Sequence, residues 1–128
     1  MQNALFISCF ILCSASGAGL RLAITNLAKI FFGHAFYGTL CVNFLGSVVI
    51  GIIYLLLNEL WQSDKTWHYV IVVGFLGSLT TFSGFSLEVV DMLMQKQWLV
   101  AMIYSFLSLF LCVVVTLAVI NLGALLLK

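Results

Sequence analysis

The sequence predicts an all-α integral membrane protein with four transmembrane helices. Of its 128 residues, 64% are hydrophobic, only 7% are charged and none is proline. Soluble domains carry about 25% charged residues, so this composition excludes a soluble globular fold. Because one spanning helix needs about 20 apolar residues, the length fits four spans with short connections. We therefore expect a single four-helix transmembrane domain over residues 1–128.

Apolar periodicity defines the four spans, which are expected to be helices because a helix satisfies its own backbone hydrogen bonds in hydrocarbon. Their predicted bounds are 3–27, 34–57, 69–94 and 98–126. The cysteines fall inside these apolar runs and lack the spacing of zinc or redox motifs, so we expect free thiols that pack as small hydrophobes. They are Cys9, Cys13, Cys41 and Cys112.

Four ionisable residues sit at or near the ends of the first and third spans. They are Arg21, Glu88, Asp91 and Lys96. Charge inside a membrane is costly and marks a candidate functional residue. Arg21 ends the first apolar run, where it either anchors the helix at the headgroups or attracts an anion. Glu88 is the more deeply placed acid, whereas Asp91 is expected at the interface.

Small and polar residues recur every four positions in the second span and form one stripe of the helix. They are Thr39, Asn43, Ser47 and Gly51. Close helix packing explains the glycine and Ser47. Asn43 is different, because a carboxamide at membrane depth must find hydrogen-bond partners. Both an ion-facing role and a structural bond between helices remain open for it.

The third span is the most unusual, because glycine and hydroxyl residues crowd a segment that otherwise spans the membrane. They are Gly74, Gly77, Ser78, Thr80, Thr81, Ser83 and Gly84. Each glycine weakens a helix by roughly 1 kcal/mol relative to alanine, so we expect a break near residues 77–84. Freed carbonyls there can coordinate a cation, and freed N–H groups favour anions. Phe82 and Phe85 either pack in the core or present their electropositive ring edges to a small anion.

A second polar line follows the fourth span. Tyr104, Ser108, Cys112 and Thr116 step by four, with Ser105 beside them. Each hydroxyl alone is commonly structural, bonding back to its own helix. Two facing polar stripes, however, offer hydrogen-bond donors along most of a membrane thickness.

The charges give no preferred orientation in the membrane. One side would carry Lys65 and Lys128, and the other Arg21, Lys29 and Lys96, a tally that the N-terminal amine evens. A chain without bias can insert both ways, and four helices alone leave little room for an aqueous path. We therefore hypothesise an antiparallel homodimer of oppositely inserted copies.

Other function classes find no support in the sequence. A formal net charge of +1 supplies no basic patch for nucleic acid. Because no nucleophile and base pair or metal cluster is apparent, we expect a protein that is not an enzyme.

Three motifs in register resemble those of the Fluc family of fluoride channels, also called CrcB-like proteins. Gly17-Ala-Gly-Leu-Arg21 resembles the family's G-A-x-x-R at the end of its first helix. The segment from Gly38 to Ser47, which contains Asn43, is similar to its G-T-L-x-V-N-x-x-G-S signature. The segment from Gly74 to Ser83 resembles its G-x-x-G-x-x-T-T-F-S signature. Together the motifs cover the first three spans.

The resemblance implies a dual-topology antiparallel dimer in the plasma membrane that passively and selectively exports fluoride. It also implies a structural sodium ion at the dimer centre, held by the backbone carbonyls of Gly77 and Thr80, and a vestibule at Arg21. It assigns the fluoride pathway to Thr39, Asn43, Thr81, Phe82, Ser83, Phe85, Tyr104 and Ser108. The chain departs from the family pattern at Ser78, Gly84 and residues 14–16, and Cys112 stands where a hydroxyl would suit the pathway.

Two alternatives remain at this stage. Small multidrug transporters also have four short helices and can be dual-topology, but they need a buried acid in the first span, and residues 1–20 contain no Asp or Glu. A membrane assembly subunit without transport activity would use the same small and polar stripes only for helix packing.

Overall fold

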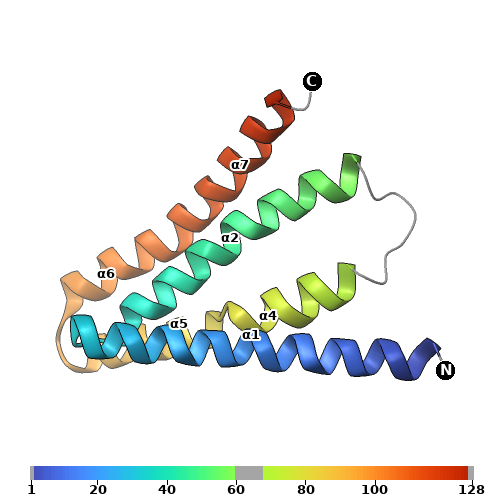
Figure 1. Ribbon diagram of the computed structural model, residues 1–128. Coiled ribbons are helices and arrows are strands. Elements are labelled where there is room, and N and C mark those ends of the chain that lie inside the picture. Colours follow the sequence, from blue (N-terminus) through green and yellow to red (C-terminus); the bar gives the residue numbers. More distant parts are fainter. Residues whose placement is uncertain (1, 60–67, 127–128) are drawn as a thin grey trace.

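The computed structural model describes residues 2–59 and 68–126, which are helical almost throughout (Figure 1). Four helical stretches are long and apolar enough to cross a membrane, so the predicted all-helical, four-span organisation is confirmed. In chain order the elements are α1 (Gln2–Phe32), α2 (Phe36–Glu59), η1 (Tyr69–Leu76), α4 (Gly77–Leu79), α5 (Phe82–Met94), α6 (Trp98–Phe106), η2 (Leu107–Leu111) and α7 (Cys112–Leu126).

The first helix is longer than predicted. Helix α1 continues to Phe32, whereas the predicted span ends at residue 27. The polar residues after Arg21 do not interrupt it, because the Thr25 hydroxyl donates to the Arg21 carbonyl within the helix at 2.9 Å. Arg21 therefore lies inside α1 and not at its end. Lys65 and Lys128, which enter the count of charges, lie outside the described residues.

The helices pack as pairs (Figure 1). Helix α2 lies along α7, α1 lies along η1 and α4, and α5 packs against α6. In Figure 1 the pairs diverge from the end of the molecule that holds the α1–α2 and α5–α6 turns. The first and last described residues lie at the other end.

The third span is broken where the sequence predicts. Thr80 (φ −82°, ψ 154°) and Thr81 (φ −149°, ψ 121°) are extended, between α4 and α5. The break is narrower than the predicted segment 77–84, because residues on both sides remain helical. The sequence did not predict that η1 and η2 are π-helical, a rare geometry that often occurs at functional sites.

The buried core is small and lies in two clusters. One contains Phe85, Met92, Ala101 and Tyr104, and the other contains Val42, Leu76 and Leu79. Helix α7 has no fully buried residue. Much of the apolar surface thus remains exposed, and lipid or a second protein copy would cover it.

Gly17 allows α1 to approach η1 closely. Gly17 is buried, and a Cβ atom at this position would collide with the backbone carbonyl oxygen of Phe75. A backbone atom cannot move aside as the end of a side chain can. Gly19 lies on the same helix and would present its Cβ to open space.

We predict that Gly17→Ala lowers the free energy of unfolding by about 1–3 kcal/mol, because α1 must move away from η1. Gly19→Ala is the matched control and should not lower it, since alanine is the better helix former. Unfolding of both variants by increasing SDS in mixed micelles, followed by circular dichroism, measures this. Equal stability of the two variants would contradict the close approach.

Candidate functional site

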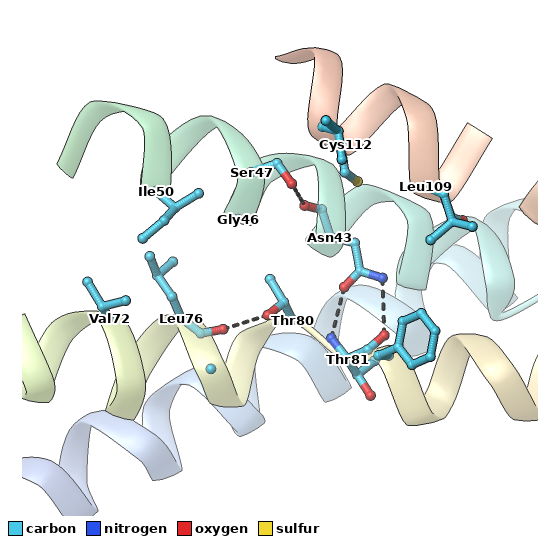
Figure 2. A pocket seen from close by; sticks show the side chains of 14 residues that line it. Asn43, Gly46, Ser47, Ile50, Val72, Leu76, Thr80, Thr81, Leu109 and Cys112 are labelled. Carbon is cyan, nitrogen blue, oxygen red and sulfur yellow. Dashed lines mark hydrogen bonds between the residues drawn. The ribbon is translucent and has the colours of Figure 1, made fainter. Parts of the chain in front are cut away.

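A pocket of about 420 Å³ lies beside the break in the third span, between α2, the η1–α4 segment and the η2–α7 segment (Figure 2). We call it the central pocket. Its lining combines apolar side chains with several hydrogen-bonding groups. The lining residues are Asn43, Gly46, Ser47, Ile50, Val72, Leu76, Gly77, Thr80, Thr81, Phe82, Ser108, Leu109, Cys112 and Val113.

Asn43 holds the break by bonding to the backbone of one residue. Its amide nitrogen donates to the Thr81 carbonyl at 3.1 Å, and its Oδ1 accepts from the Thr81 N–H at 2.8 Å (Figure 2). This is the pairing that a neighbouring β-strand would offer, supplied here by a side chain on α2. It satisfies an extended backbone residue at membrane depth, where water cannot do so. Of the two roles left open for Asn43, the structural bond between helices is present, and one of its two N–H groups remains for another acceptor.

The same bonds release two carbonyl groups. In an uninterrupted α-helix, the Thr81 N–H would bond to the Gly77 carbonyl and the Gly84 N–H to the Thr80 carbonyl. The Thr81 N–H is instead donated to Asn43, and the Gly84 N–H to the Thr81 hydroxyl at 3.0 Å. The carbonyls of Gly77 and Thr80 are thereby freed from these helical partners.

Thr80 closes the helix before the break and packs against α2. Its N–H and its hydroxyl both donate to the Leu76 carbonyl at 2.9 Å. Its methyl group faces Gly46, where any Cβ atom would collide with it. A glycine at position 46 therefore lets α2 approach the break closely enough for Asn43 to reach Thr81.

The two phenylalanines after the break take different positions. Their ring centroids are 5.4 Å apart and their planes are inclined at 51°. Phe82 lines the central pocket and is 68% exposed in the single chain. Phe85 is buried, with its ring 5.3 Å from that of Tyr104. Of the two roles left open for the phenylalanines, core packing thus applies to Phe85, whereas the Phe82 ring is exposed.

Glu88 gathers two of the predicted pathway hydroxyls. Thr39 donates to its Oε1 at 2.8 Å, and Tyr104 donates to its Oε2 at 2.6 Å. Thr39 and Tyr104 are both buried, and each comes from a different span from Glu88. The three residues form a hydrogen-bonded group apart from the central pocket, which we call the Glu88 group.

Ser108 carries a buried oxygen without a partner. The residue is 7% exposed, and its Oγ has no hydrogen-bond partner within the described part of the chain. Serine in a membrane helix often bonds back to the carbonyl four residues earlier. Ser108 lies in the π-helical turn η2 and belongs to the lining of the central pocket, although its Oγ itself has almost no accessible surface. A buried unpaired oxygen costs about 1–3 kcal/mol and is typical of a site that receives a ligand or water.

Comparison with known proteins identifies the family. The family model described as "CrcB-like protein, Camphor Resistance (CrcB)" matches residues 8–120. The chain belongs to the CrcB-like family. A relative from Haemophilus influenzae (strain PittGG) is 40% identical over 116 residues, which are 91% of this chain and 88% of that protein. A relative from Shewanella amazonensis is 43% identical over 116 residues, covering 90% of each chain. Both relatives are named "Fluoride-specific ion channel FluC".

The structure of this CrcB-like chain brings many of the predicted site residues together. The central pocket is lined by Gly77 and Thr80, predicted for sodium, and by Asn43, Thr81, Phe82 and Ser108, predicted for fluoride. Three other predicted pathway residues, Thr39, Phe85 and Tyr104, gather near Glu88 and do not line this pocket. Ser83 is exposed, with its Oγ 3.3 Å from the Thr81 hydroxyl. Arg21 is half-buried on α1 and does not line the pocket.

Sequence analysis did not include Glu88 among the site residues. The available signal was an acid inside a span, which marked Glu88 as a candidate without naming its partners.

The line of residues stepping by four from Tyr104 to Thr116 is also divided in the structure. Tyr104 joins Glu88, Ser108 and Cys112 line the pocket, and Thr116 donates to the Ser47 carbonyl at 3.0 Å.

Gly84, a departure from the CrcB-like pattern, fits its surroundings closely. Its N–H is the donor to the Thr81 hydroxyl, and a Cβ atom at this position would lie 3.0 Å from the Thr81 methyl carbon. A glycine here allows Thr81 to cap α5.

We predict that Tyr104→Phe lowers the free energy of unfolding by about 1–3 kcal/mol, because Glu88 Oε2 loses its donor while the ring still fills the core. Tyr37→Phe, which removes a hydroxyl from an exposed residue, should change it by less than about 0.5 kcal/mol. SDS unfolding of the two variants compares them. If Tyr104→Phe were as stable as Tyr37→Phe, the bond to Glu88 would contribute nothing.

Proposed function

We propose that this chain forms a fluoride-selective channel that exports fluoride passively across the plasma membrane and so prevents its accumulation. The observation that carries the proposal is the donor-lined central pocket at a helix break, in a chain whose relatives are named fluoride-specific ion channels. Fluoride holds water tightly, so a pathway must replace that water with hydrogen-bond donors and still release the ion onward. The second Asn43 N–H and the Ser108 hydroxyl are donors of this kind.

In this proposal the aromatic and polar groups act in succession. The ring edges of Phe82 and Phe85 carry partial positive charge that attracts a small anion without trapping it. Thr81 and Ser83 contribute hydroxyls at the start of α5. Thr39 and Tyr104, whose hydroxyls donate to Glu88, lie at one end of the route. Arg21 attracts anions at the vestibule.

We further propose a structural sodium ion bound by the Gly77 and Thr80 carbonyls. The release of both carbonyls from their helical partners supports this assignment, because unwound carbonyls are typical sodium ligands in membrane proteins. Gly77 is exposed in the single chain, so a second copy of the protein can reach the backbone at this residue. Two oxygens from one chain are few for such an ion, and an inverted copy would bring two more.

An antiparallel homodimer completes the proposal. The balanced charges of the sequence, the exposed Phe82 ring and the lack of fully buried residues on α7 all support a partner on this face. A second copy would cover the open side of the central pocket and exclude lipid from it.

The alternative functions have less support. A proton-coupled multidrug transporter of the small type would need a buried acid in its first span, and residues 1–58 contain no Asp or Glu. For a subunit without transport activity, the unpaired Ser108 oxygen and the pocket beside it would have no use. Fluoride efflux from liposomes that contain only the purified protein tests the channel directly, and its absence would favour the assembly subunit.

We predict that Asn43→Asp abolishes or severely reduces fluoride efflux from loaded liposomes. Aspartate cannot donate to the Thr81 carbonyl, and its charge repels the anion. A like charge at about 4 Å costs about 4 kcal/mol at an effective dielectric constant of about 20, which corresponds to a rate about a thousandfold lower. Asn121→Asp is the control, because Asn121 is exposed and bonds only within α7, to the Leu117 carbonyl. An unchanged rate in Asn43→Asp would remove Asn43 from the mechanism.

We also predict that the chain inserts in both orientations. Two reporters are fused to the C-terminus, one active only on the inner side of the membrane and the other only on the outer side. Both fusions should show activity, because some copies of the protein face each way. The matched variant adds Lys or Arg next to Lys96 on the α5–α6 turn, which should drive the population to one orientation. A single orientation of the unmodified chain would rule out the antiparallel dimer.

A further inference from the structure

We propose that the Glu88 carboxylate is a competitor for fluoride that is built into the chain. It occupies the hydroxyl donors of Thr39 and Tyr104, and it must leave them before an anion can pass this end of the route. Glu88 thereby determines how strongly an anion must accept hydrogen bonds in order to pass. The inference rests on the proposed channel function, because that function places the two hydroxyls on an anion route.

Both hydroxyls are already used in the structure. A hydroxyl carries one O–H group, so it can donate fully to one acceptor at a time. Thr39 donates to Glu88 Oε1 at 2.8 Å, and Tyr104 donates to Glu88 Oε2 at 2.6 Å. Hydrogen bonds to a carboxylate are charge-assisted and roughly twice as strong as those between neutral groups. Neither hydroxyl can therefore donate to a passing ion while Glu88 keeps this position.

The donors are held more firmly than their acceptor. Thr39 and Tyr104 are each 3% exposed. The Tyr104 ring packs against those of Phe36 and Phe85, with its centroid 5.3 Å from each. Glu88 is only half-buried on α5, and a glutamate side chain is long and flexible. Rotation of the Glu88 side chain would thus leave both hydroxyls in place as a preformed pair of donors.

Charge prevents Glu88 and fluoride from sharing the two donors. Repulsion between two unit negative charges about 4 Å apart lowers their joint occupancy about a thousandfold at an effective dielectric constant of about 20. Fluoride therefore reaches the hydroxyls only when the carboxylate moves away, and the returning carboxylate expels the ion. Conduction needs both binding and release at each site, and this exchange supplies the release. Chloride is larger and a weaker acceptor than a carboxylate, so it would not displace Glu88.

The first test follows the Glu88 carboxylate itself. The chain contains two glutamates, Glu59 and Glu88. Protein labelled with ¹³C at the glutamate side-chain carboxyls and placed in nanodiscs should give two NMR signals, which Glu59→Gln assigns. Sodium fluoride should shift the Glu88 signal, because the carboxylate loses its two hydroxyl donors, whereas the same concentration of sodium chloride should not. A Glu88 signal that stays unchanged at fluoride concentrations that support efflux would overturn the proposal.

The second test measures how fluoride efflux from liposomes depends on fluoride concentration. Glu88→Gln keeps the size of the side chain but removes its charge, which leaves a weaker acceptor. The concentration that gives half-maximal efflux should fall at least about tenfold, because a competitor held by charge-assisted bonds is lost. Asp91→Asn is the matched control on the same helix, where Asp91 is exposed, and should leave this concentration unchanged. An unchanged or higher concentration in Glu88→Gln would contradict the role of Glu88.

The two tests also separate this inference from the channel function. If Glu88→Gln does not fold, the carboxylate signal of the unmodified protein decides the question. Efflux from the unmodified protein together with an unresponsive Glu88 signal would refute the competitor alone. Absence of efflux from the unmodified protein would refute the channel function, and with it the role of Glu88 in conduction.

Discussion

The pairing of the Asn43 carboxamide with the Thr81 backbone is the interaction on which the rest of the site depends. Extended residues in the middle of a membrane span expose polar backbone groups that hydrocarbon cannot satisfy. Asn43 accepts the Thr81 N–H and donates to its carbonyl, and therefore makes the break tolerable. Gly46 lies one turn further along α2 and leaves space for the Thr80 methyl group. A side chain at this position would collide with that methyl and keep α2 from approaching the break.

This pairing also determines which backbone groups are available to ligands. Because the Thr81 and Gly84 N–H groups bond to side chains, the Gly77 and Thr80 carbonyls are released on one side of the break. On the other side, α5 begins with Phe82 exposed at the pocket and Phe85 buried against Tyr104. A single side chain on α2 thus holds Thr81, the residue between the released carbonyls and the two phenylalanines.

The polar groups of the fourth span serve two environments. Tyr104 donates to Glu88 with Thr39, whereas Ser108, one turn later, is left unpaired at the central pocket. The π-helical turn η2 contains Ser108 and lies between α6 and α7. Hydroxyls that look equivalent in the sequence therefore differ in the structure, since two of them donate to Glu88 and the buried Ser108 oxygen has no partner in the described part of the chain.

Hydropathy and glycine content predicted the four spans and the break, because both reflect local physical demands of the membrane. The sequence also marked Asn43 but left its role open, since only the folded chain brings Thr81 within reach. The partners of Glu88, the π-helical turns and the continuation of α1 to Phe32 could not be predicted. The partners of Glu88 lie on other helices, and periodicity within one helix does not encode such contacts.

Amide hydrogen exchange at Thr81, measured by NMR on the protein in nanodiscs, tests the role of Asn43 most directly. A hydrogen bond worth about 1 kcal/mol slows exchange about fivefold, so Asn43→Ala should accelerate exchange at Thr81 by at least about that factor. The Thr39 amide, bonded to the Ala35 carbonyl at 3.2 Å, is the internal control and should not change. Equal exchange at Thr81 in the two proteins would contradict the claim that Asn43 holds the break.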